Sequence, residues 1–169
     1  LYAADNWPNC EHRYLDDEAV EVLAPPDLDR NAFFQDLMHQ VEWIAAREGR
    51  VEGFLNWQGV VNNAYRLRGE QLFYDMVEAP DRARHLFDCV ATTMLDAARR
   101  LHARQRETGV AVEFFTVSNC LVNMVSPAQY RDLLLPFDRR IAEAYGCIGI
   151  HNCAWTADAY MAHYAAVPH

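Results

Sequence analysis

Apolar residues recur at helical spacing along three long segments of the chain. The first lies between Asp29, which we expect to cap a helix, and Gly49, which we expect to end it. The second covers residues 60–77 and is interrupted by a glycine. The third opens at Pro80, a residue suited to a first helical turn, and continues to Gly109. The pattern therefore predicts three helices before residue 110.

Two further helices are expected in the last third of the chain. Residues 126–129 read Ser-Pro-Ala-Gln, which is a capping box with proline at the first helical position. The helix that follows should be kinked or divided by Pro136 and should end at Gly146. A last helix should begin at Thr156 or Asp158.

Runs of apolar and β-branched residues between these helices predict strands. The clearest runs are residues 110–117 and 147–151, and a shorter buried strand is expected at 51–56. Residues 1–29 contain prolines and an acidic run, so we expect an irregular lead-in with at most a short strand near 20–23.

Strands that alternate with helices are typical of βαβ units, which pair their strands in a parallel sheet. We expect an α/β fold with residues 1–169 in a single domain, as part of a (β/α)8 barrel or of a doubly wound sheet. A complete barrel takes roughly 250 residues. The chain should therefore hold only part of such a barrel, and we expect flanking parts of the natural protein to be missing from the sequence.

Charge and composition narrow the range of partners. The net charge is −9, and an acidic chain repels nucleic acid and anionic membranes, so we expect neither as a partner. The chain has no lysine, which excludes Schiff-base chemistry and a P-loop within this stretch. It has neither a run of 18 apolar residues nor a signal-peptide pattern at its start, so a cytoplasmic location is the default expectation.

Polar residues follow the three main predicted strands. Sites in parallel α/β folds lie at the carboxyl ends of the strands, so the residues at these ends form the candidate site. The candidate substrate-binding residues are Asn56, Gln58, Ser118, Asn119 and Trp155.

His151 and Cys153 are the clearest candidates for metal binding. Residues two apart in an extended segment point to the same side, and imidazole and thiolate are both good zinc ligands. A catalytic zinc needs about three protein ligands, and the third is either Cys120 or a residue beyond His169. The alternative interpretation is a chance His-x-Cys pair, with Cys120 as a buried structural thiol.

Other reactive side chains have simpler explanations. Cys89 lies in a helical apolar stripe and Cys147 at the start of a strand, so both are expected in the core. His102 lies on a predicted helix and is expected at the surface or rim. Arg66 and Arg68 are able to bind carboxylates as forks, but a solvated helix face is the favoured interpretation.

Four segments, in the right order between residues 30 and 160, resemble the uroporphyrinogen decarboxylase superfamily. Residues 56–69 look like its strand, glycine turn and helix, and residues 78–80 look like the start of its next helix. Residues 126–136, with Ser-Pro followed by an aromatic residue and a proline, resemble its "SP…F…P" helix. His151-Asn152-Cys153 is similar to the His-x-Cys of its cobalamin-linked methyltransferase branch.

This resemblance implies a (β/α)8 barrel with its site in the barrel mouth. In the methyltransferase branch, zinc is held by the His and Cys of this motif and by a later cysteine, and it activates a thiol that attacks a methyl–cobalt bond on a corrinoid partner. The decarboxylase branch needs no cofactor. Two departures stand out, because Ala154 replaces the usual glycine and the segment 118–120 lacks an acidic residue.

The leading hypothesis is a zinc-dependent methyltransferase that moves a methyl group between a corrinoid and a thiol or similar small-molecule acceptor. A corrinoid protein is its expected partner. The first alternative is a cofactor-free decarboxylase acting on tetrapyrrole acetate groups. The second is an inactive, truncated barrel that serves as an interaction module, because exposed parallel strand edges invite pairing and a homo-oligomer would bury them.

Overall fold

The protein is a mixed α/β fold built on a three-stranded parallel sheet in the order β1-β2-β3. The computed structural model describes residues 13–53, 55–153 and 156–168. The strands are short: β1 is Trp57–Gln58, β2 is Phe115–Ser118 and β3 is Ile148–His151. The predicted α/β class and the predicted parallel pairing are therefore confirmed.

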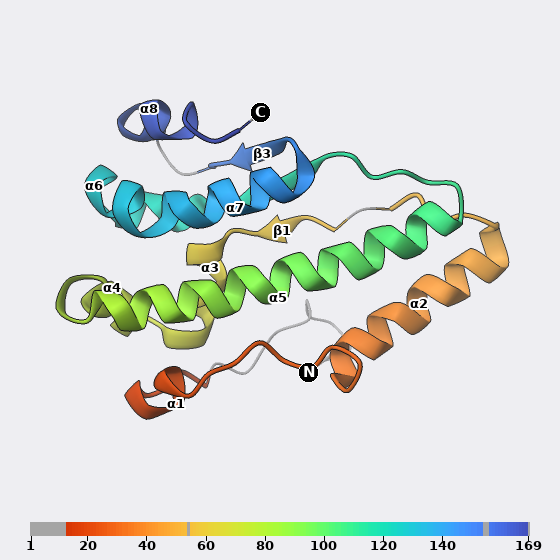
Figure 1. The fold of residues 1–169 in the computed structure, drawn as a ribbon, viewed down its shortest axis with the longest axis horizontal. Coiled ribbons are helices and arrows are strands. Elements are labelled where there is room, and N and C mark those ends of the chain that lie inside the picture. Colours follow the sequence, from red (N-terminus) through yellow and green to blue (C-terminus); the bar gives the residue numbers. More distant parts are fainter. Residues whose placement is uncertain (1–12, 54, 154–155, 169) are drawn as a thin grey trace, which may run out of the picture.

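Helices make up most of the described chain and connect the strands (Figure 1). The α-helices are α1 (Asp17–Glu21), α2 (Ala32–Glu48), α3 (Val60–Arg68), α4 (Gln71–Glu78), α5 (Pro80–Glu107), α6 (Pro127–Gln129), α7 (Leu135–Tyr145) and α8 (Met161–Tyr164). Two 3-10 segments are η1 (Cys120–Met124) and η3 (Asp158–Tyr160), and η2 (Tyr130–Leu134) is a π-helical turn. None of these helices combines the length and apolarity needed to cross a membrane.

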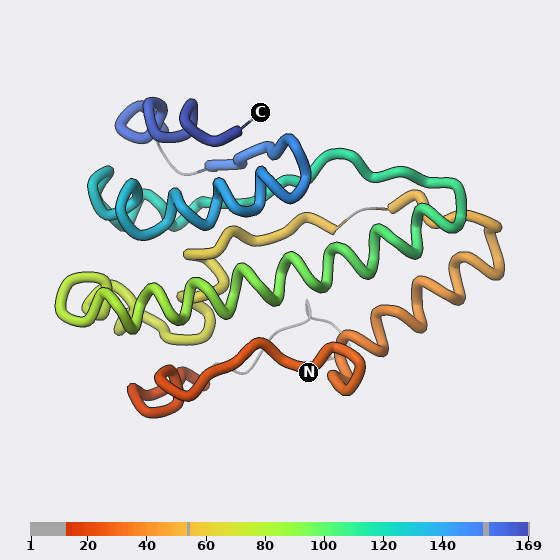
Figure 2. The backbone as a smooth tube through the Cα atoms, viewed as in Figure 1, coloured from red at the N-terminus to blue at the C-terminus, as the bar shows by residue number. Residues whose placement is uncertain are grey.

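Several helix boundaries follow the local signals in the sequence. Pro80 opens α5, which runs along much of the molecule in Figure 2. At the start of α6, the Ser126 hydroxyl accepts a hydrogen bond from the Gln129 amide, and the Gln129 side chain accepts one from the Ser126 amide, as a capping box requires. Gly49 ends α2 in the left-handed conformation, with φ 76°. The predicted division near Pro136 is the π-turn η2, directly before α7.

The start of the chain differs from two sequence expectations. A helix, α1, replaces the strand expected near 20–23, because the Asp16 carboxylate accepts a hydrogen bond from the Ala19 amide at 2.9 Å and caps a helical turn. Helix α2 is capped by Asn31, whose Oδ1 accepts from the Phe34 amide at 3.0 Å, and not by Asp29.

The first strand lies later in the chain than expected, at Trp57–Gln58 rather than at 51–56. The backbone at Val51 is bonded to the end of α5 instead of to a strand. Its amide donates to the Thr108 hydroxyl at 3.1 Å, and its carbonyl accepts from the Gln105 side chain at 3.0 Å. The second strand is also shorter than the apolar run at 110–117, because its pairing with β3 begins only at Phe115.

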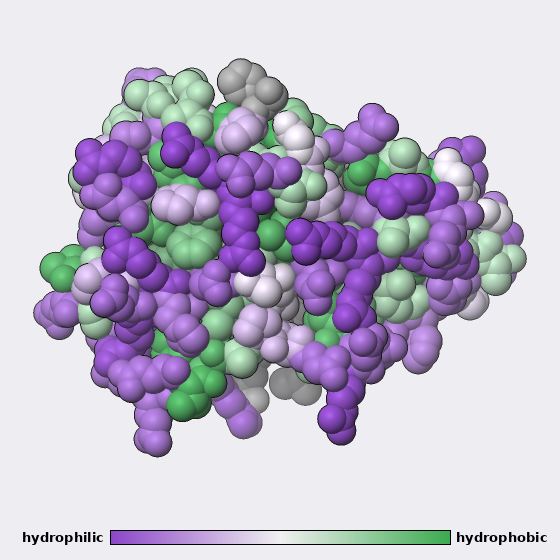
Figure 3. Space-filling view, in the orientation of Figure 1, coloured by the Kyte–Doolittle hydropathy of each residue, from purple (hydrophilic) through white to green (hydrophobic). Residues whose placement is uncertain are grey.

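One face of the sheet packs against α5 and α7. Phe115 of β2 lies there, with its ring centroid 4.6 Å from that of Tyr145 and 5.5 Å from that of Trp57. Val117 shares this face and is fully buried. The outer side of these helices is mainly hydrophilic on the face shown in Figure 3. The alternate residues Gln58, Ser118 and His151 point to the other face of the sheet.

Arg68 does not lie on a solvated helix face, as the sequence had favoured. It is 3% exposed and forms a bidentate ion pair with Asp75, in which Nε and Nη2 lie 2.8 Å and 3.2 Å from the two carboxylate oxygens. Its guanidinium also donates to the Leu15 carbonyl and to Asp17. Arg66, by contrast, is exposed. Burial of Arg68 is stable because two carboxylates and a carbonyl of other segments accept hydrogen bonds from its guanidinium.

Two further expectations about single side chains need correction. His102 is buried at 3% exposure, packs edge-on against the rings of Phe115 and Tyr145, and is not a surface residue. Cys147 is half-buried and directly precedes β3, so it is not a core residue. The expectation for Cys89 is confirmed, because this thiol is buried on α5.

Candidate metal centre

The carboxyl ends of the three strands are aligned with one another. Gln58 of β1 is paired with Ser118 of β2, which is paired with His151 of β3. Beyond the strands, the Gly59 amide donates to the Ser118 carbonyl and the Asn119 amide donates to the His151 carbonyl, both at 2.8 Å. The loops after the strands therefore begin side by side.

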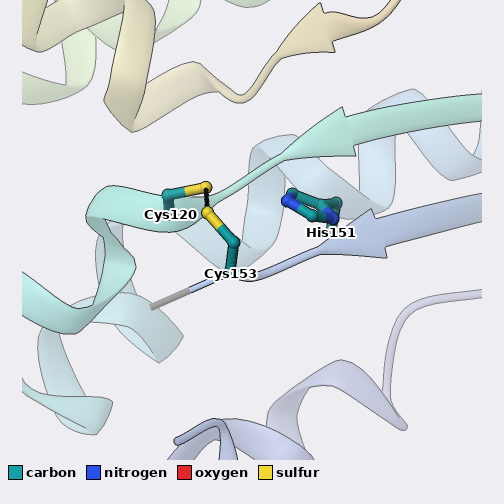
Figure 4. Close-up of side chains that lie close together, drawn as sticks. All are labelled: Cys120, His151 and Cys153. Carbon is teal, nitrogen blue, oxygen red and sulfur yellow. Dashed lines mark hydrogen bonds between the residues drawn. The ribbon is translucent and has the colours of Figure 1, made fainter. Parts of the chain in front are cut away.

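This alignment brings Cys120, His151 and Cys153 together. Their potential ligand atoms all lie within 4.8 Å of one another, and the two Sγ atoms are 2.8 Å apart and hydrogen bonded (Figure 4). Cys120 is half-buried, while His151 and Cys153 are exposed. The cluster is therefore held by the protein on one side and open to solvent on the other.

The third side chain of this cluster comes from an earlier strand. Sequence reasoning left the choice between Cys120 and a residue beyond His169 open, and the structure brings Cys120 beside the His-x-Cys pair. In this respect the geometry departs from the resemblance, which implies a later cysteine. Cys120, two residues after β2, meets the His-x-Cys that begins at the last residue of β3, because β2 and β3 are neighbours in the sheet.

The donor set fits zinc. Two thiolates and one imidazole are ligands that zinc accepts in tetrahedral sites, with an open position for a fourth group. Two sulfurs on one tetrahedral zinc lie about 3.8 Å apart, given Zn–S bonds of about 2.3 Å. The Cys120 and Cys153 thiols are closer than this, so they must rotate apart to admit an ion.

Hydrogen bonding with Cys120, and then burial, raise the pKa of the Cys153 thiol. The raised pKa favours the thiol form of Cys153 in the metal-free protein. Metal binding requires both thiols to lose their protons, so binding should release protons and strengthen as the pH rises.

The candidate substrate-binding residues divide into two groups. Ser118 and Asn119 are buried, and their side chains bond to Asn56 and Asp138 respectively. Asn56 and Gln58 line a cavity of about 750 Å³ beside β1. Trp155 lies outside the described residues.

This cavity has a mainly apolar wall with a few polar groups. Helix α5 contributes Val90, Met94 and Ala97 to the wall. Its polar lining includes Asn63 and Arg66 of α3 in addition to Asn56 and Gln58. A mainly apolar cavity with a few polar groups is typical of a small-molecule site.

Sequence reasoning missed two side chains that hold the loops of the cluster. Asn123 of η1 donates to the Cys120 carbonyl at 3.2 Å and to Asn152 Oδ1 at 2.9 Å. Asp138 of α7 is 2% exposed, and its Oδ2 accepts from Asn119 Nδ2 at 2.8 Å. Neither residue has a sequence signal, because each is defined by a partner on another segment of the chain.

Burial raises the pKa of Asp138 to about 6, although two hydrogen bonds oppose this effect. The donors are the Tyr130 hydroxyl, at 2.6 Å, and the Asn119 side chain. Burial and the nearby Asp138 also raise the pKa of Tyr130 above its usual range. At neutral pH the carboxyl is therefore mainly ionised, and it is a strong acceptor for both donors.

No protein-family model, curated protein or solved structure matches the chain. The interpretation of the cluster therefore depends on its geometry and on the chemistry of its side chains.

Proposed function

We propose that the chain binds Zn²⁺ through Cys120, His151 and Cys153 and takes part in zinc-dependent methyl transfer between a corrinoid and a thiol or similar acceptor. The observation that carries this proposal is the convergence of three ligand side chains from two neighbouring strand ends. Three protein ligands leave one position open, which is typical of catalytic rather than structural zinc.

The chain's own residues would hold the ion and leave it accessible. The exposed side of the cluster, formed by His151 and Cys153, allows a substrate to approach. When bound, zinc lowers the pKa of a coordinated thiol and so supplies a thiolate nucleophile near neutral pH. Asn56 and Gln58, which line the cavity beside β1, are suited to hydrogen bonding the body of an acceptor.

The fold supports the same proposal. A parallel sheet with polar strand ends, and with α5 and α7 on one face, is what we would expect of a segment of a (β/α)8 barrel. In that setting the face with Gln58, Ser118 and His151 would point to the barrel interior, and the cluster would lie at the mouth where the sites of such barrels lie.

The decarboxylase alternative has less support. It requires several arginines around a tetrapyrrole. Arg68 is bound to Asp75, and among the described residues that line the cavity Arg66 is the one arginine. Turnover of uroporphyrinogen by metal-free protein would favour this alternative.

Metal analysis of the purified chain tests the zinc site. We expect one zinc per chain, and we expect Cys120→Ser and Cys153→Ser to lose most of it, because each removes one of three ligands. Cys147→Ser is the matched control, because this half-buried thiol lies outside the cluster. The variant protein should keep its zinc. Zinc-free parent protein, or equal zinc in all variants, would contradict the proposal.

Activity is tested separately with methylcob(III)alamin and a small thiol. Zinc-loaded protein should demethylate the corrinoid, with a change in its visible spectrum, and Cys153→Ser should abolish this. Zinc binding without demethylation would leave the metal site in place and refute methyl transfer.

A further inference from the structure

We propose that Asp138 is a positioning residue for the metal centre, which acts through Asn119 to hold Cys120 beside His151 and Cys153. The inference rests on the proposed zinc site, but concerns residues that contribute no ligand atom. It follows from the contacts of Asn119, the residue directly before Cys120.

Asn119 is in contact with the ends of all three strands. It follows β2, and its amide donates to the carbonyl of the ligand residue His151 at 2.8 Å. Its side-chain oxygen lies so close to Gly59, after β1, that a Cβ at Gly59 would be 1.7 Å from it. Asn119 is 2% exposed, so it has no alternative position in solvent.

The bond to Asp138 is what holds the Asn119 side chain in this place. Its Nδ2 donates to Asp138 Oδ2 at 2.8 Å, whereas its buried Oδ1 has no hydrogen-bond partner among the described residues. A buried polar group without a partner costs free energy, so the single bond to an ionised carboxylate must offset this cost. Loss of that bond should release the side chain.

Asp138 is itself held by the π-turn and α7. The Tyr130 hydroxyl donates to Asp138 Oδ2 at 2.6 Å, and the Tyr130 ring is fully buried against Tyr160 and Tyr164. π-Helical turns of this kind are frequent at functional sites. The carboxylate is therefore a rigid acceptor that fixes the loop after β2 from the helical layer.

Residues behind the ligands of a metal site usually change its affinity by about 10–100-fold. We expect Asp138→Ala to weaken Zn²⁺ binding by at least about tenfold, because Cys120 would lose its defined position. Asp138→Asn retains an oxygen for Asn119 and should rescue binding to within about threefold of the parent, a smaller loss than such residues usually cause.

Tyr130→Phe is the matched control. It removes the other hydrogen bond to the same carboxylate and should lower the free energy of unfolding, but it leaves the bond to Asn119 in place. We expect its zinc affinity to change by less than about threefold, below the usual range for residues behind a ligand. This variant therefore shows whether a loss of stability by itself, without loss of the Asp138–Asn119 bond, weakens zinc binding.

The experiment measures Zn²⁺ affinity by competition with a chromophoric chelator, and the visible spectrum of the Co²⁺-loaded protein, with folding checked by circular dichroism. Asn119→Ala removes the same bond from its other side and serves if Asp138→Ala does not fold. Asp138→Ala and Asn119→Ala break the same hydrogen bond. The double variant should therefore lose no more Zn²⁺ affinity than the more affected single variant. Folded single variants with the parent's affinity and Co²⁺ spectrum would overturn the inference.

A metal-free measurement separates this inference from the proposed function. Diamide oxidises two adjacent thiols to a disulfide, taking up their two electrons and two protons to become the hydrazine, so its rate reports how close Cys120 and Cys153 lie. Asp138→Ala should slow formation of the disulfide, and Tyr130→Phe should not. A parent chain that binds no Zn²⁺ would refute the proposed function, and the diamide rates alone would then decide the positioning role, with equal rates in all three proteins overturning it.

Discussion

Gly59 and Asn119 approach each other more closely than any residue with a side chain would allow. The backbone of Gly59 is not unusual, with φ −67°, so glycine is needed here for space and not for conformation. A Cβ would meet Asn119 Oδ1 at 1.7 Å and the Ser118 carbonyl oxygen at 3.0 Å. Because Asn119 is held by Asp138, it cannot move away without losing its hydrogen bond.

Gly59→Ala should therefore lower the free energy of unfolding by about 1–3 kcal/mol, as overpacking in a well-packed site does. Gly53→Ala is the control, since a Cβ there meets nothing within 4 Å. That variant should change stability by less than about 0.5 kcal/mol. Urea unfolding curves measure both, and equal midpoints would show that Asn119 yields easily.

At the scale of elements, a network of charged side chains ties α1 to α3, α4 and α5. Arg68, the last residue of α3, binds Asp75 of α4 and Asp17 of α1. Arg82 of α5 binds Asp75 at 3.4 Å and also pairs with Asp17 and with Glu21. Both arginines share two carboxylates, and Asp75, at 2% exposure, is the buried one.

Asp75→Ala should cost about 3–5 kcal/mol of unfolding free energy, because it leaves the buried charge of Arg68 without its buried carboxylate partner. Glu42→Ala breaks the more exposed pair between Glu42 and Arg104, and should lower the free energy of unfolding far less, because solvent screens this pair. The two variants are compared by urea denaturation. Similar losses of unfolding free energy in both variants would mean that burial adds little to the stabilising effect of the Arg68–Asp75 pair.

At the scale of the whole molecule, the helical layer and the sheet meet at a core that contains an ionisable group. His102 of α5 lies in this core, and its Nδ1 is buried without a hydrogen-bond partner in the described part of the chain. Burial first, and then the nearby charge of Arg106, lower the pKa of His102 below 6.5. The folded protein therefore keeps this imidazole neutral, while the unfolded chain takes up a proton near pH 6.5.

It follows that His102 makes the folded state less stable as the pH falls. Above pH 6.5 neither state is protonated here and stability is unaffected, whereas between 6.5 and the lower folded-state pKa the unfolded state binds more protons. The loss has a limiting slope of about 1.4 kcal/mol per pH unit. Urea midpoints at pH 7 and pH 5, with a chelator present, should fall less in His102→Gln than in the parent. Parallel falls would contradict this assignment.

The sequence by itself determined several helix boundaries and the positions of the candidate ligands along the chain. Pro80, the capping box at Ser126 and the glycine after α2 each act through neighbours within a few residues, so their effects are visible without a fold. The alternation of helices and apolar runs likewise indicated a parallel sheet, and polar residues at the strand ends indicated a site.

Only the tertiary structure decided which of these residues meet. The pairing of β2 with β3 selects Cys120 as the third member of the cluster, and the packing of α7 places Asp138 against Asn119. The burial of Arg68 and His102 was also decided there, because burial depends on what other segments pack against a helix face. Contacts between residues distant in sequence arise from the packing of whole elements, and no local pattern of apolar and polar residues encodes them.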